Sequence, residues 1–491
     1  AAALLNENHT GFKPYSLGSC CWRELGFVWD KGMGKMMEQL PFKIAARYSY
    51  FDAKYTWLLY LHYMEQIEAE GFEDLWKLEC DVTNVVVNME HNGVPIDTDA
   101  IKAVDIEFKK ELDETYALIR DAAGWDINLN AAAEIRKLVY EVRKHKPVMW
   151  TNKTQEPSTA AAALEAIAAK DEVVKAVVHW ASLHKMHSTF VTGIQEKLHK
   201  GRVHGGFNQR GARTGRFSSD NPNLQNIPTR QTKVIRDMFI APPGWRMIVA
   251  DYSQIELRLL AHFSQDPVLI RAYNEGLNLH TLTAQKAFHV KEPSKLQYSY
   301  AKNTNFTLVF GGSPETIAER YTVPLKDARL AHKAFYDTYR RVEPWRNSVV
   351  AKTKKRRVSA DYAEWSGKKV SPPYATTITG RRRRLPEIFW NDRKARSYAE
   401  RQSVSHEIQG SAGDINKYAL VNVQTYITAN DLPWQIILTV HDEMVTLVPE
   451  DEAEAAAKTI KSLMENLPLP VQLRVPLEVD VDICSRWSEK S

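Results

Sequence analysis

The sequence predicts a mixed protein of the α/β (α+β) class, built from several structural units. Its 491 residues exceed the length of one ordinary domain. Long segments carry apolar side chains at helical spacing, whereas two apolar runs, WRMIVADYS and QIILTVHDEMVTLV, have the character of buried strands. An apolar content of 44% and a charged content of 25% are ordinary for soluble globular proteins, so we expect a sizeable core.

Helical patterns dominate the first 200 residues. Residues 48–63 and the stretch from residue 78 to the turn predicted at NGVPID have helical spacing. Residues 98–145 predict long helices with charged faces. A polar, Pro-containing stretch at 151–160 interrupts the pattern, which resumes over 164–197.

The second half alternates between strand-like and helical segments. Residues 201–226 are rich in Gly, Arg, Asn and Ser and have little periodicity. WRMIVADYS then predicts a strand that ends in a carboxylate, with a helix following to about residue 262. Residues 278–345 predict helices, and the last 60 or so residues predict a hairpin, a helix at 452–466 and a final strand.

Residues 352–384 form a one-sided basic segment. They contain eleven Lys or Arg against two acids, Asp361 and Glu364. A charge run of this kind is either a solvated face or a contact for a polyanion, and the sequence leaves both open.

Several classes of protein are disfavoured. No apolar run approaches the ~18 residues of a membrane span, and the N-terminus lacks the pattern of a secretory signal. The four cysteines show no metal-binding spacing, so we expect free thiols and a reducing, cytoplasmic location. The missing initiator Met suggests that the sequence begins inside a longer protein.

Two strand-like runs each place a carboxylate at the end of a predicted sheet. Asp251 ends the first run, and His441, Asp442 and Glu443 form the predicted turn of the second. Two carboxylates that meet repel each other, and divalent metal ions relieve the repulsion. Two such ions can stabilise both the attacking and the leaving oxygen of a phosphoryl transfer. Each Asp on its own also fits an ordinary cap or turn residue.

Lys302, Phe306 and Phe310 recur at intervals of four residues and predict one face of a helix. A cation beside two rings suits a nucleoside triphosphate. The same spacing fits an ordinary amphipathic helix with a snorkelling lysine.

Three longer motifs carry a resemblance. DYSQIELRLLAHFS, AKNTNFTLVFGG and VHDEMV are similar to the three polymerase motifs of the A-family DNA polymerases, the family of bacterial DNA polymerase I. TGRFSSDNPNLQNIPTR and AERQSVSHEIQGSAGD resemble the segments before the first and third motifs. The resemblance runs in order from about residue 78 to the end.

The resemblance implies a right-hand polymerase fold with palm, fingers and thumb, preceded by a partial RNase H-like 3′–5′ exonuclease domain. The implied divisions are an exonuclease remnant (1–72), the start of the polymerase domain with a helical thumb (73–200), the first part of the palm (201–265), fingers (266–395, with the motif helix at about 295–311) and the second part of the palm (396–491).

The resemblance also implies a template-directed DNA polymerase that extends a primer with dNTPs. Asp251, Asp442 and the Tyr252 carbonyl would hold two Mg²⁺ ions, for which Mn²⁺ can substitute, with Glu443 nearby. Glu256 would leave no room for a ribose 2′-hydroxyl. The implied nucleotide site comprises Tyr252, Gln254, Glu256, His280, Lys302, Phe306, Phe310 and Arg230. The implied primer–template contacts are Arg216, Asn223, Gln225, Gln254, Arg401, Gln409 and His441.

Four positions depart from the family pattern. Tyr298 replaces an Arg one turn before Lys302, and Phe310 replaces a Tyr whose hydroxyl can bond to Glu256. Ser405 replaces an Asn, and Asn278 replaces an Asp. We expect altered phosphate contact or sugar discrimination.

Tyr48 and Asp52 match the YxxxD element of the family's exonuclease, but its two upstream motifs are absent from the sequence. We therefore expect no proofreading by this chain. The predicted thumb lacks the insertion through which one phage member recruits host thioredoxin, so such a partner is not expected. We expect a monomer, located in the cytosol of a bacterium or of a phage-infected host. A single-subunit RNA polymerase and a catalytically silent DNA-binding protein remain the alternatives; Glu256 argues against the first, and both metal carboxylates argue against the second.

Overall fold

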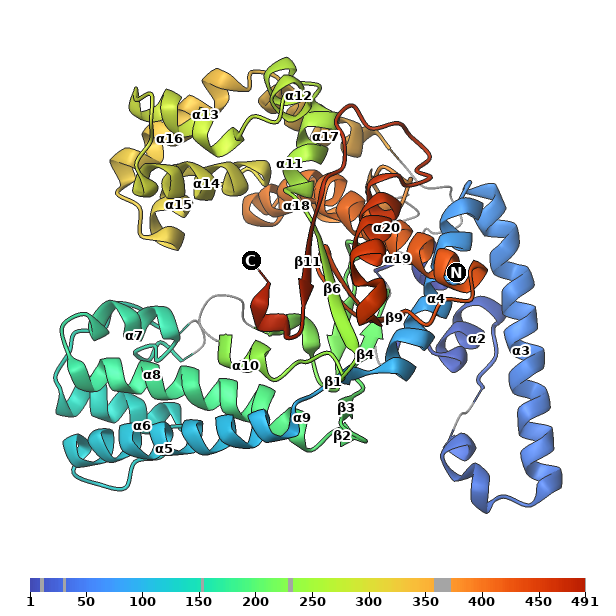
Figure 1. Cartoon of the computed structure of the whole chain (residues 1–491), viewed down its shortest axis with the longest axis horizontal. Helices are drawn as coiled ribbons and strands as arrows, with labels where there is room; N and C mark the ends of the chain where they lie inside the picture. The colour runs from blue at the N-terminus through green and yellow to red at the C-terminus, as the bar shows by residue number, and fades with distance from the viewer. Residues whose placement is uncertain (9–12, 30–31, 152–153, 228–232, 357–371, 491) are drawn as a thin grey trace.

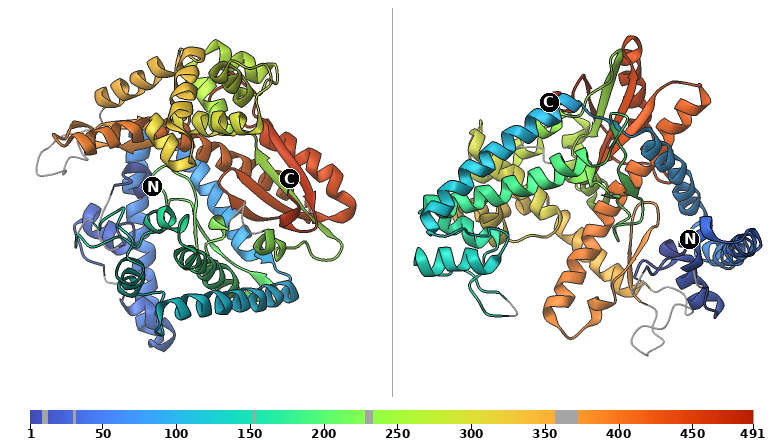
Figure 2. Two further views of the ribbon diagram at one scale, coloured as in Figure 1. Left: turned by 90° about the vertical axis from the view of Figure 1, so that its left-hand side faces the viewer. Right: turned by 90° about the horizontal axis from the view of Figure 1, so that it is seen from below.

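The structure is a computed structural model that describes residues 1–8, 13–29, 32–151, 154–227, 233–356 and 372–490. Helical groups surround one central antiparallel sheet (Figure 1). The helices of residues 2–92 lie at one end of the molecule. Those of residues 98–195, called the helical arm below, lie at the opposite end in both Figure 1 and the right-hand view of Figure 2. This arrangement confirms the mixed fold class that the sequence predicts.

The central sheet has the strand order β11-β6-β10-β9, and every neighbouring pair is antiparallel. Its strands are β6 (Trp245–Tyr252), β9 (Gln435–Val440), β10 (Glu443–Pro449) and β11 (Val479–Cys484). The two predicted apolar runs therefore pair with each other, because β6 lies beside β10 along its whole length. Helix α20 (Ala453–Glu465) packs against β6 and β11.

The group that follows β6 is helical throughout. It comprises α11 (Ile255–Ser264), α12 (Pro267–Asn274), α13 (Leu279–Phe288), α14 (Lys295–Val309), α15 (Pro314–Tyr321), α16 (Leu325–Thr338) and α17 (Val342–Lys355). Local sequence sets several of these ends. Asp266 and Asn278 cap the first turns of α12 and α13 with their side chains, and Ser294 forms a capping box with Gln297 at the start of α14.

The helical arm has a hydrophobic core of its own, which includes Ile119, Ile127 and Leu138. Its elements are α5 (Thr98–Ala123), α6 (Ala132–Arg136), η2 (Lys137–Val142), α7 (Ala161–Ala168), α8 (Glu172–Met186), η3 (His187–Thr192) and α9 (Gly193–Gln195). The long helices predicted over 98–145 are thus one long helix and two short ones. Gly124 ends α5 in the left-handed conformation, with φ of 82°.

The first 92 residues form helices wherever the structure describes them, apart from their connections. They are α1 (Ala2–Leu5), α2 (Leu17–Leu25), η1 (Gly32–Gln39), α3 (Phe42–Ala69) and α4 (Glu73–Asn92). The helix predicted around residues 48–63 lies within α3.

The remaining elements connect or flank these groups. They are β1 (Val94–Pro95), β2 (Leu198–His199), β3 (Arg202–Val203), β4 (Gly206–Asn208), β5 (Ser218–Asp220), η4 (Leu224–Asn226), α10 (Lys233–Asp237), β7 (Tyr374–Thr376), β8 (Arg382–Arg384), η6 (Pro386–Phe389), α18 (Arg393–Ser405), η7 (His406–Gly410), α19 (Ser411–Ala429), η8 (Glu450–Glu452) and η9 (Trp487–Glu489). Residues 201–226, which lack a clear pattern, therefore contain short strand pairs.

Among the described residues, no helix has the length and apolar character needed to cross a membrane.

Candidate active site

Two acidic residues from distant parts of the sequence meet at one end of the central sheet. Asp251 lies near the end of β6, directly opposite Glu443 at the start of β10. Asp442 lies in the tight turn between β9 and β10, where its main-chain oxygen accepts a 3.4 Å hydrogen bond from the Tyr252 N–H. Antiparallel pairing of the two apolar runs therefore brings the carboxylate-bearing ends together.

Hydrogen bonds from α19 stabilise the turn that carries Asp442. His441 has φ of 59°, the left-handed conformation that a non-glycine residue adopts only when its surroundings require it. The side-chain amide of Asn416, which is buried in α19, donates a 3.1 Å hydrogen bond to the His441 carbonyl and another of 3.1 Å to the Thr439 hydroxyl. This support fixes where the Asp442 side chain begins.

Asp442 lies in surroundings that oppose its charge. Burial, followed by the negative charge of Asp251, raises the pKa of Asp442 from its ordinary value near 3.8 to about 7, and the Arg216 guanidinium only partly offsets this. A cation brought to these oxygens would favour the ionised form. The end of the sheet is thus short of positive charge.

A divalent metal ion fits this donor set. Carboxylate and main-chain oxygens are the ligands that Mg²⁺ takes in proteins, and Mg²⁺ usually uses one or two carboxylates together with substrate phosphates. Within the described part of the chain, no group of three or more His, Cys, Asp or Glu side chains is arranged to hold a metal ion unaided. Asp251 and Asp442 therefore suit an open site that substrate oxygens complete.

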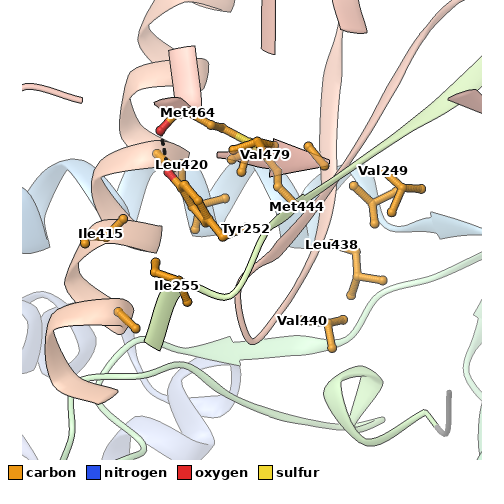
Figure 3. Packing of buried hydrophobic residues seen from close by; sticks show 14 of the residues in the cluster. Val249, Tyr252, Ile255, Ile415, Leu420, Leu438, Val440, Met444, Met464 and Val479 are labelled. Carbon is orange, nitrogen blue, oxygen red and sulfur yellow. Dashed lines mark hydrogen bonds between the residues drawn. The ribbon is translucent and has the colours of Figure 1, made fainter. Parts of the chain in front are cut away.

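The Tyr252 side chain is not available to this site. Its side chain is buried in the core beneath the sheet, and its hydroxyl donates a 2.7 Å hydrogen bond to the Met464 carbonyl (Figure 3). The phenol is directed away from the carboxylates. The Tyr252 carbonyl remains as the group predicted to bind a metal.

Glu443 is occupied by partners from the C-terminus. It is buried, and its two carboxylate oxygens accept hydrogen bonds from Trp487 Nε1 at 2.8 Å and from Lys490 Nζ at 2.5 Å. Lys490 Nζ also lies 2.6 Å from Asp251 Oδ2. Glu443 therefore lies beside Asp251, with its carboxylate bonded to protein groups.

Glu256, the residue predicted to exclude a ribose 2′-hydroxyl, forms an ion pair. Glu256 Oε1 lies 2.6 Å from Arg216 NH2, and both side chains are largely buried. Gln254 begins α11 in the left-handed conformation and accepts a 3.2 Å hydrogen bond from the Tyr273 hydroxyl. Arg216, predicted to contact the primer, is thus also the partner that orients Glu256.

Helix α14 places Lys302 and Phe306 on one side, facing α13. The Phe306 ring centroid lies 5.5 Å from that of His280, whose Nδ1 is 3.0 Å from the Asn305 amide. Burial, together with the charge of Lys302, lowers the pKa of His280 to about 4, so its imidazole is neutral at pH 7. Phe310 follows the last helical residue and is the C-cap of α14, so the predicted three-residue helix face is corrected to two residues plus a cap.

Asn278 and Tyr298, two of the four positions that depart from the family pattern, lie next to each other. Asn278 donates a 3.3 Å hydrogen bond to the hydroxyl of Tyr298, and the Tyr298 ring packs edge-on against His280. A tyrosine therefore occupies the position where the resembled family has a charged side chain.

The predicted DNA-contacting residues range from buried to exposed. Asn223 caps η4, and buried Gln225 donates a 3.1 Å hydrogen bond to the Thr439 carbonyl of β9. Arg401 is exposed on α18, and Gln409 accepts a 2.9 Å hydrogen bond from Ser405 within the irregular turn η7. Asn223 and Gln225 therefore support the backbone beside the β9–β10 turn, and their DNA contacts stay predictions.

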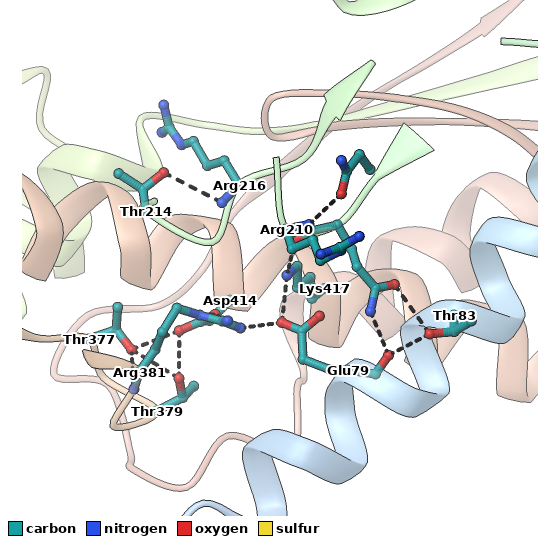
Figure 4. Close-up of polar contacts among 12 residues, drawn as sticks. Glu79, Thr83, Arg210, Thr214, Arg216, Thr377, Thr379, Arg381, Asp414 and Lys417 are labelled. Carbon is teal, nitrogen blue, oxygen red and sulfur yellow. Dashed lines mark hydrogen bonds and ion pairs between the residues drawn. The ribbon is translucent and has the colours of Figure 1, made fainter. Parts of the chain in front are cut away.

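Part of the basic segment is used inside the protein. Arg381 lies 2.5 Å from a Glu79 oxygen and 2.7 Å from an Asp414 oxygen, in a buried cluster that also contains Lys417 (Figure 4). Arg382 pairs with Glu70, and Arg384 pairs with Glu7. The hypothesis that this segment contacts a polyanion is therefore not supported for these three arginines. Residues 357–371 of the segment lie outside the described residues.

The three remaining predicted residues lie away from this site or outside the description. Asp52 accepts a 2.6 Å hydrogen bond from Trp29 Nε1, and the Tyr48 ring lies 5.4 Å from the Trp29 ring. Arg230 is not among the described residues.

Sequence reasoning missed the C-terminal groups behind the carboxylates. The Arg236 guanidinium lies over the Trp487 ring at 4.1 Å, and Trp487 and Lys490 contact Glu443 and Asp251. These residues have no periodicity or motif in the sequence that would indicate the role. Trp487, an aromatic residue within a polar stretch, is the signal that the sequence offers.

Known proteins resemble the chain along most of its length. Residues 98–489 match the family described as DNA polymerase family A. DNA polymerase I of Geobacillus stearothermophilus is 32% identical over 468 residues, which are 94% of this chain and 51% of that protein. The thermostable DNA polymerase I of Thermus aquaticus is 33% identical over 428 residues, 85% of this chain and 49% of that protein.

A solved structure has the same fold. The POL domain of Pol1 from M. smegmatis, in complex with DNA primer-template and dNTP, superposes with a TM-score of 0.85 at 28% identity. The match covers 99% of this chain and 81% of that one. The chain spans about half the length of the curated relatives named above. The chain belongs to DNA polymerase family A.

Proposed function

We propose that this chain is a template-directed DNA polymerase that adds dNTPs to a primer 3′-hydroxyl. The observation that carries the proposal is that Asp251, near the end of β6, and Asp442, in the β9–β10 turn, lie at the same end of the central sheet, within a chain that belongs to DNA polymerase family A. The similar Pol1 domain from M. smegmatis was solved with DNA primer-template and dNTP, which supports the same partners here.

Asp251, Asp442 and the Tyr252 carbonyl would hold two Mg²⁺ ions. Bound there, the ions would activate the primer hydroxyl and neutralise the charge that develops on the triphosphate. The pKa of Asp442 near 7 supports this assignment, because the site lacks the positive charge that its carboxylates need.

The protein's own side chains would position the nucleotide. Lys302 lies on α14 beside a neutral His280, and no ion pair involves Lys302 within the part of the chain that is described, so its ammonium is available to phosphate oxygens. Phe306 offers a ring for the base or sugar. Glu256, oriented by Arg216, would occupy the space of a 2′-hydroxyl.

The domain divisions belong to the same proposal. Residues 201–265 and 396–491 would form the palm, since together they supply the four strands of the central sheet. The helical arm within 73–200 would be the thumb, and the helices within 266–395 the fingers. Residues 1–72 would be the exonuclease remnant that the resemblance implies, in which Asp52 accepts a hydrogen bond from Trp29 Nε1.

Primer extension tests the proposal. The wild-type chain should extend a labelled primer with dNTPs in Mg²⁺, extend it far less with rNTPs, and stop when EDTA is added. Asp251→Ala and Asp442→Ala should each reduce extension by at least about a thousandfold, whereas Lys458→Gln on the exposed face of α20 should not change it. Extension that persists in both alanine variants would refute the metal assignment. Efficient rNTP incorporation would favour an RNA polymerase.

Strand degradation tests the remnant assignment separately. A 5′-labelled single strand should remain intact in Mg²⁺ without dNTPs; its shortening, unchanged in Asp251→Ala, would show a working exonuclease.

A further inference from the structure

An ammonium group from the C-terminus lies between two of the active-site carboxylates. Lys490 Nζ is 2.6 Å from Asp251 Oδ2 and 2.5 Å from Glu443 Oε2, and the Lys490 side chain is only 18% exposed. Asp251 is a proposed metal ligand. One of its oxygens is therefore in contact with a cation that belongs to the protein.

The segment that presents Lys490 is anchored on several sides. The Trp487 ring is buried, its backbone N–H donates a 3.0 Å hydrogen bond to the Phe239 carbonyl, and its indole bonds to Glu443. Arg486 forms a 2.7 Å ion pair with Asp97 at the start of the helical arm. Glu489 accepts a hydrogen bond from the Ser485 N–H and closes the turn η9. These contacts fix the position of Lys490 next to the carboxylates.

A lysine ammonium and a divalent ion compete for the same oxygen. A Mg²⁺ ion binds oxygen at about 2.0–2.1 Å, and it cannot share the lone-pair direction of Asp251 Oδ2 with an ammonium hydrogen at the same time. Placed on neighbouring oxygens, the two cations repel each other. Their repulsion is substantial because the surroundings are only partly solvated.

We propose that Lys490 is a built-in counter-ion of the metal site, which holds Asp251 and Glu443 in place when no divalent ion is bound and competes with that ion for Asp251. It is a positioning residue, because it acts through the carboxylates. The inference rests on the proposed metal site and adds a determinant of how tightly that site binds metal.

A purely structural role for Lys490 makes the opposite prediction. If Lys490 only braced Asp251, removing it would loosen the carboxylate and weaken metal binding. If Lys490 competes, removing its charge frees an oxygen and removes a repulsion, so metal binding tightens. The direction of the change separates the two roles.

Binding of Mn²⁺ to the full chain without DNA measures this directly, by the loss of the free-ion electron paramagnetic resonance signal. Lys490→Gln should lower the Kd for Mn²⁺ by roughly three- to tenfold, the range expected for loss of one partly screened charge. Lys490→Arg keeps the charge and should stay within about twofold of wild type. Lys458→Gln makes the same change in net charge at an exposed position of α20 and should not alter the Kd.

Two further variants keep the outcomes distinct. Unchanged or weaker Mn²⁺ binding by Lys490→Gln, in a protein that melts as wild type does, would overturn the inference. Should that variant melt early, Lys490→Met, which retains the length of the side chain, gives the same comparison. Asp251→Asn should abolish the competed site. If Asp251→Asn binds Mn²⁺ as wild type does, the proposed metal site itself fails.

Discussion

Two clusters of charged side chains in this protein contain the same residue types but differ in their balance of positive and negative charge. In the buried cluster of Figure 4, Glu79 and Asp414 are bonded to Arg381, and Lys417 lies 2.6 Å from Glu79. The hydroxyls of Thr377 and Thr379 donate to Asp414 as well. Two carboxylates face two cations there, so the cluster is balanced without any ligand.

At the end of the central sheet the balance is negative. Asp251, Asp442, Glu443 and Glu256 lie near one another, and their direct cationic partners are Lys490 and Arg216. Burial and the charge of Asp251 raise the pKa of Asp442 to about 7. A balanced cluster joins parts of the fold, whereas an unbalanced one keeps an affinity for a cation. The net charge of each cluster, more than its residue types, distinguishes the structural cluster from the proposed active site.

Burial still opposes the charged forms of the side chains in the balanced cluster. Burial, then the charge of Arg381, lowers the pKa of Lys417 to about 8. Burial alone would also lower the pKa of Arg381, but the charges of Asp414 and Glu79 outweigh burial and raise it. The cluster is therefore sensitive to removal of either carboxylate.

The largest expected effect follows from breaking the balanced cluster. Glu79→Ala leaves Lys417 and Arg381 buried with one carboxylate between them, which should lower the free energy of unfolding by about 3–5 kcal/mol. Urea unfolding followed by circular dichroism measures the change. A loss below about 1 kcal/mol would mean that water or rearrangement compensates the two cations, and the contrast between the clusters would fail.

The unbalanced cluster should respond in the opposite direction. The folded pKa of Asp442 is raised above its unfolded value near 3.8, so the folded state binds more protons between about pH 4 and 7 and loses stability as pH rises through that window. Asp442→Asn removes this penalty. In EDTA at pH 8 the variant should be more stable than wild type by as much as about 4 kcal/mol.

That gain should disappear below about pH 4, where Asp442 is protonated in both states. Thermal melts at pH 4, 6 and 8 give the comparison. A gain that does not change with pH would show that it does not come from the charge of the Asp442 carboxylate, and the raised pKa would be wrong.

A cation of the proposed active site should behave unlike one of the buried cluster. Lys302→Ala removes an ammonium that has no carboxylate partner in the described structure, so its free energy of unfolding should change by less than about 0.5 kcal/mol. The kcat/KM for dNTP should fall by at least about tenfold, since a charge-assisted contact to phosphate is lost. Single-nucleotide insertion kinetics measure this, and a large loss of stability with normal kinetics would contradict the assignment.

The smallest effect is expected for an exposed ion pair. Lys77 lies 2.7 Å from Asp81 on the surface of α4, and Glu79 lies between them in the sequence. Lys77→Ala should change the free energy of unfolding by less than about 0.5 kcal/mol. Its contrast with Glu79→Ala, on the same helix, isolates the contribution of burial.

Local patterns in the sequence determined much of the fold and the outline of the candidate site. Apolar runs predicted β6 and the β9–β10 hairpin, and helical spacing predicted α3, α4 and most later helices. Because each of these signals lies within one short segment, it can be recognised without knowledge of the fold. The carboxylates at the strand ends, with their flanking motifs, likewise predicted an acidic site and the family.

Tertiary structure alone decided which charges are shared. Lys490 lies 239 residues from Asp251, and Arg381 lies 302 residues from Glu79. Neither pairing has a local signature, because a buried ion pair is selected by the desolvation that three-dimensional packing imposes on both partners. For the same reason a run of arginines at 381–384 resembles a polyanion contact in the sequence, although folding uses Arg381, Arg382 and Arg384 to join the N-terminal helices to the rest of the molecule.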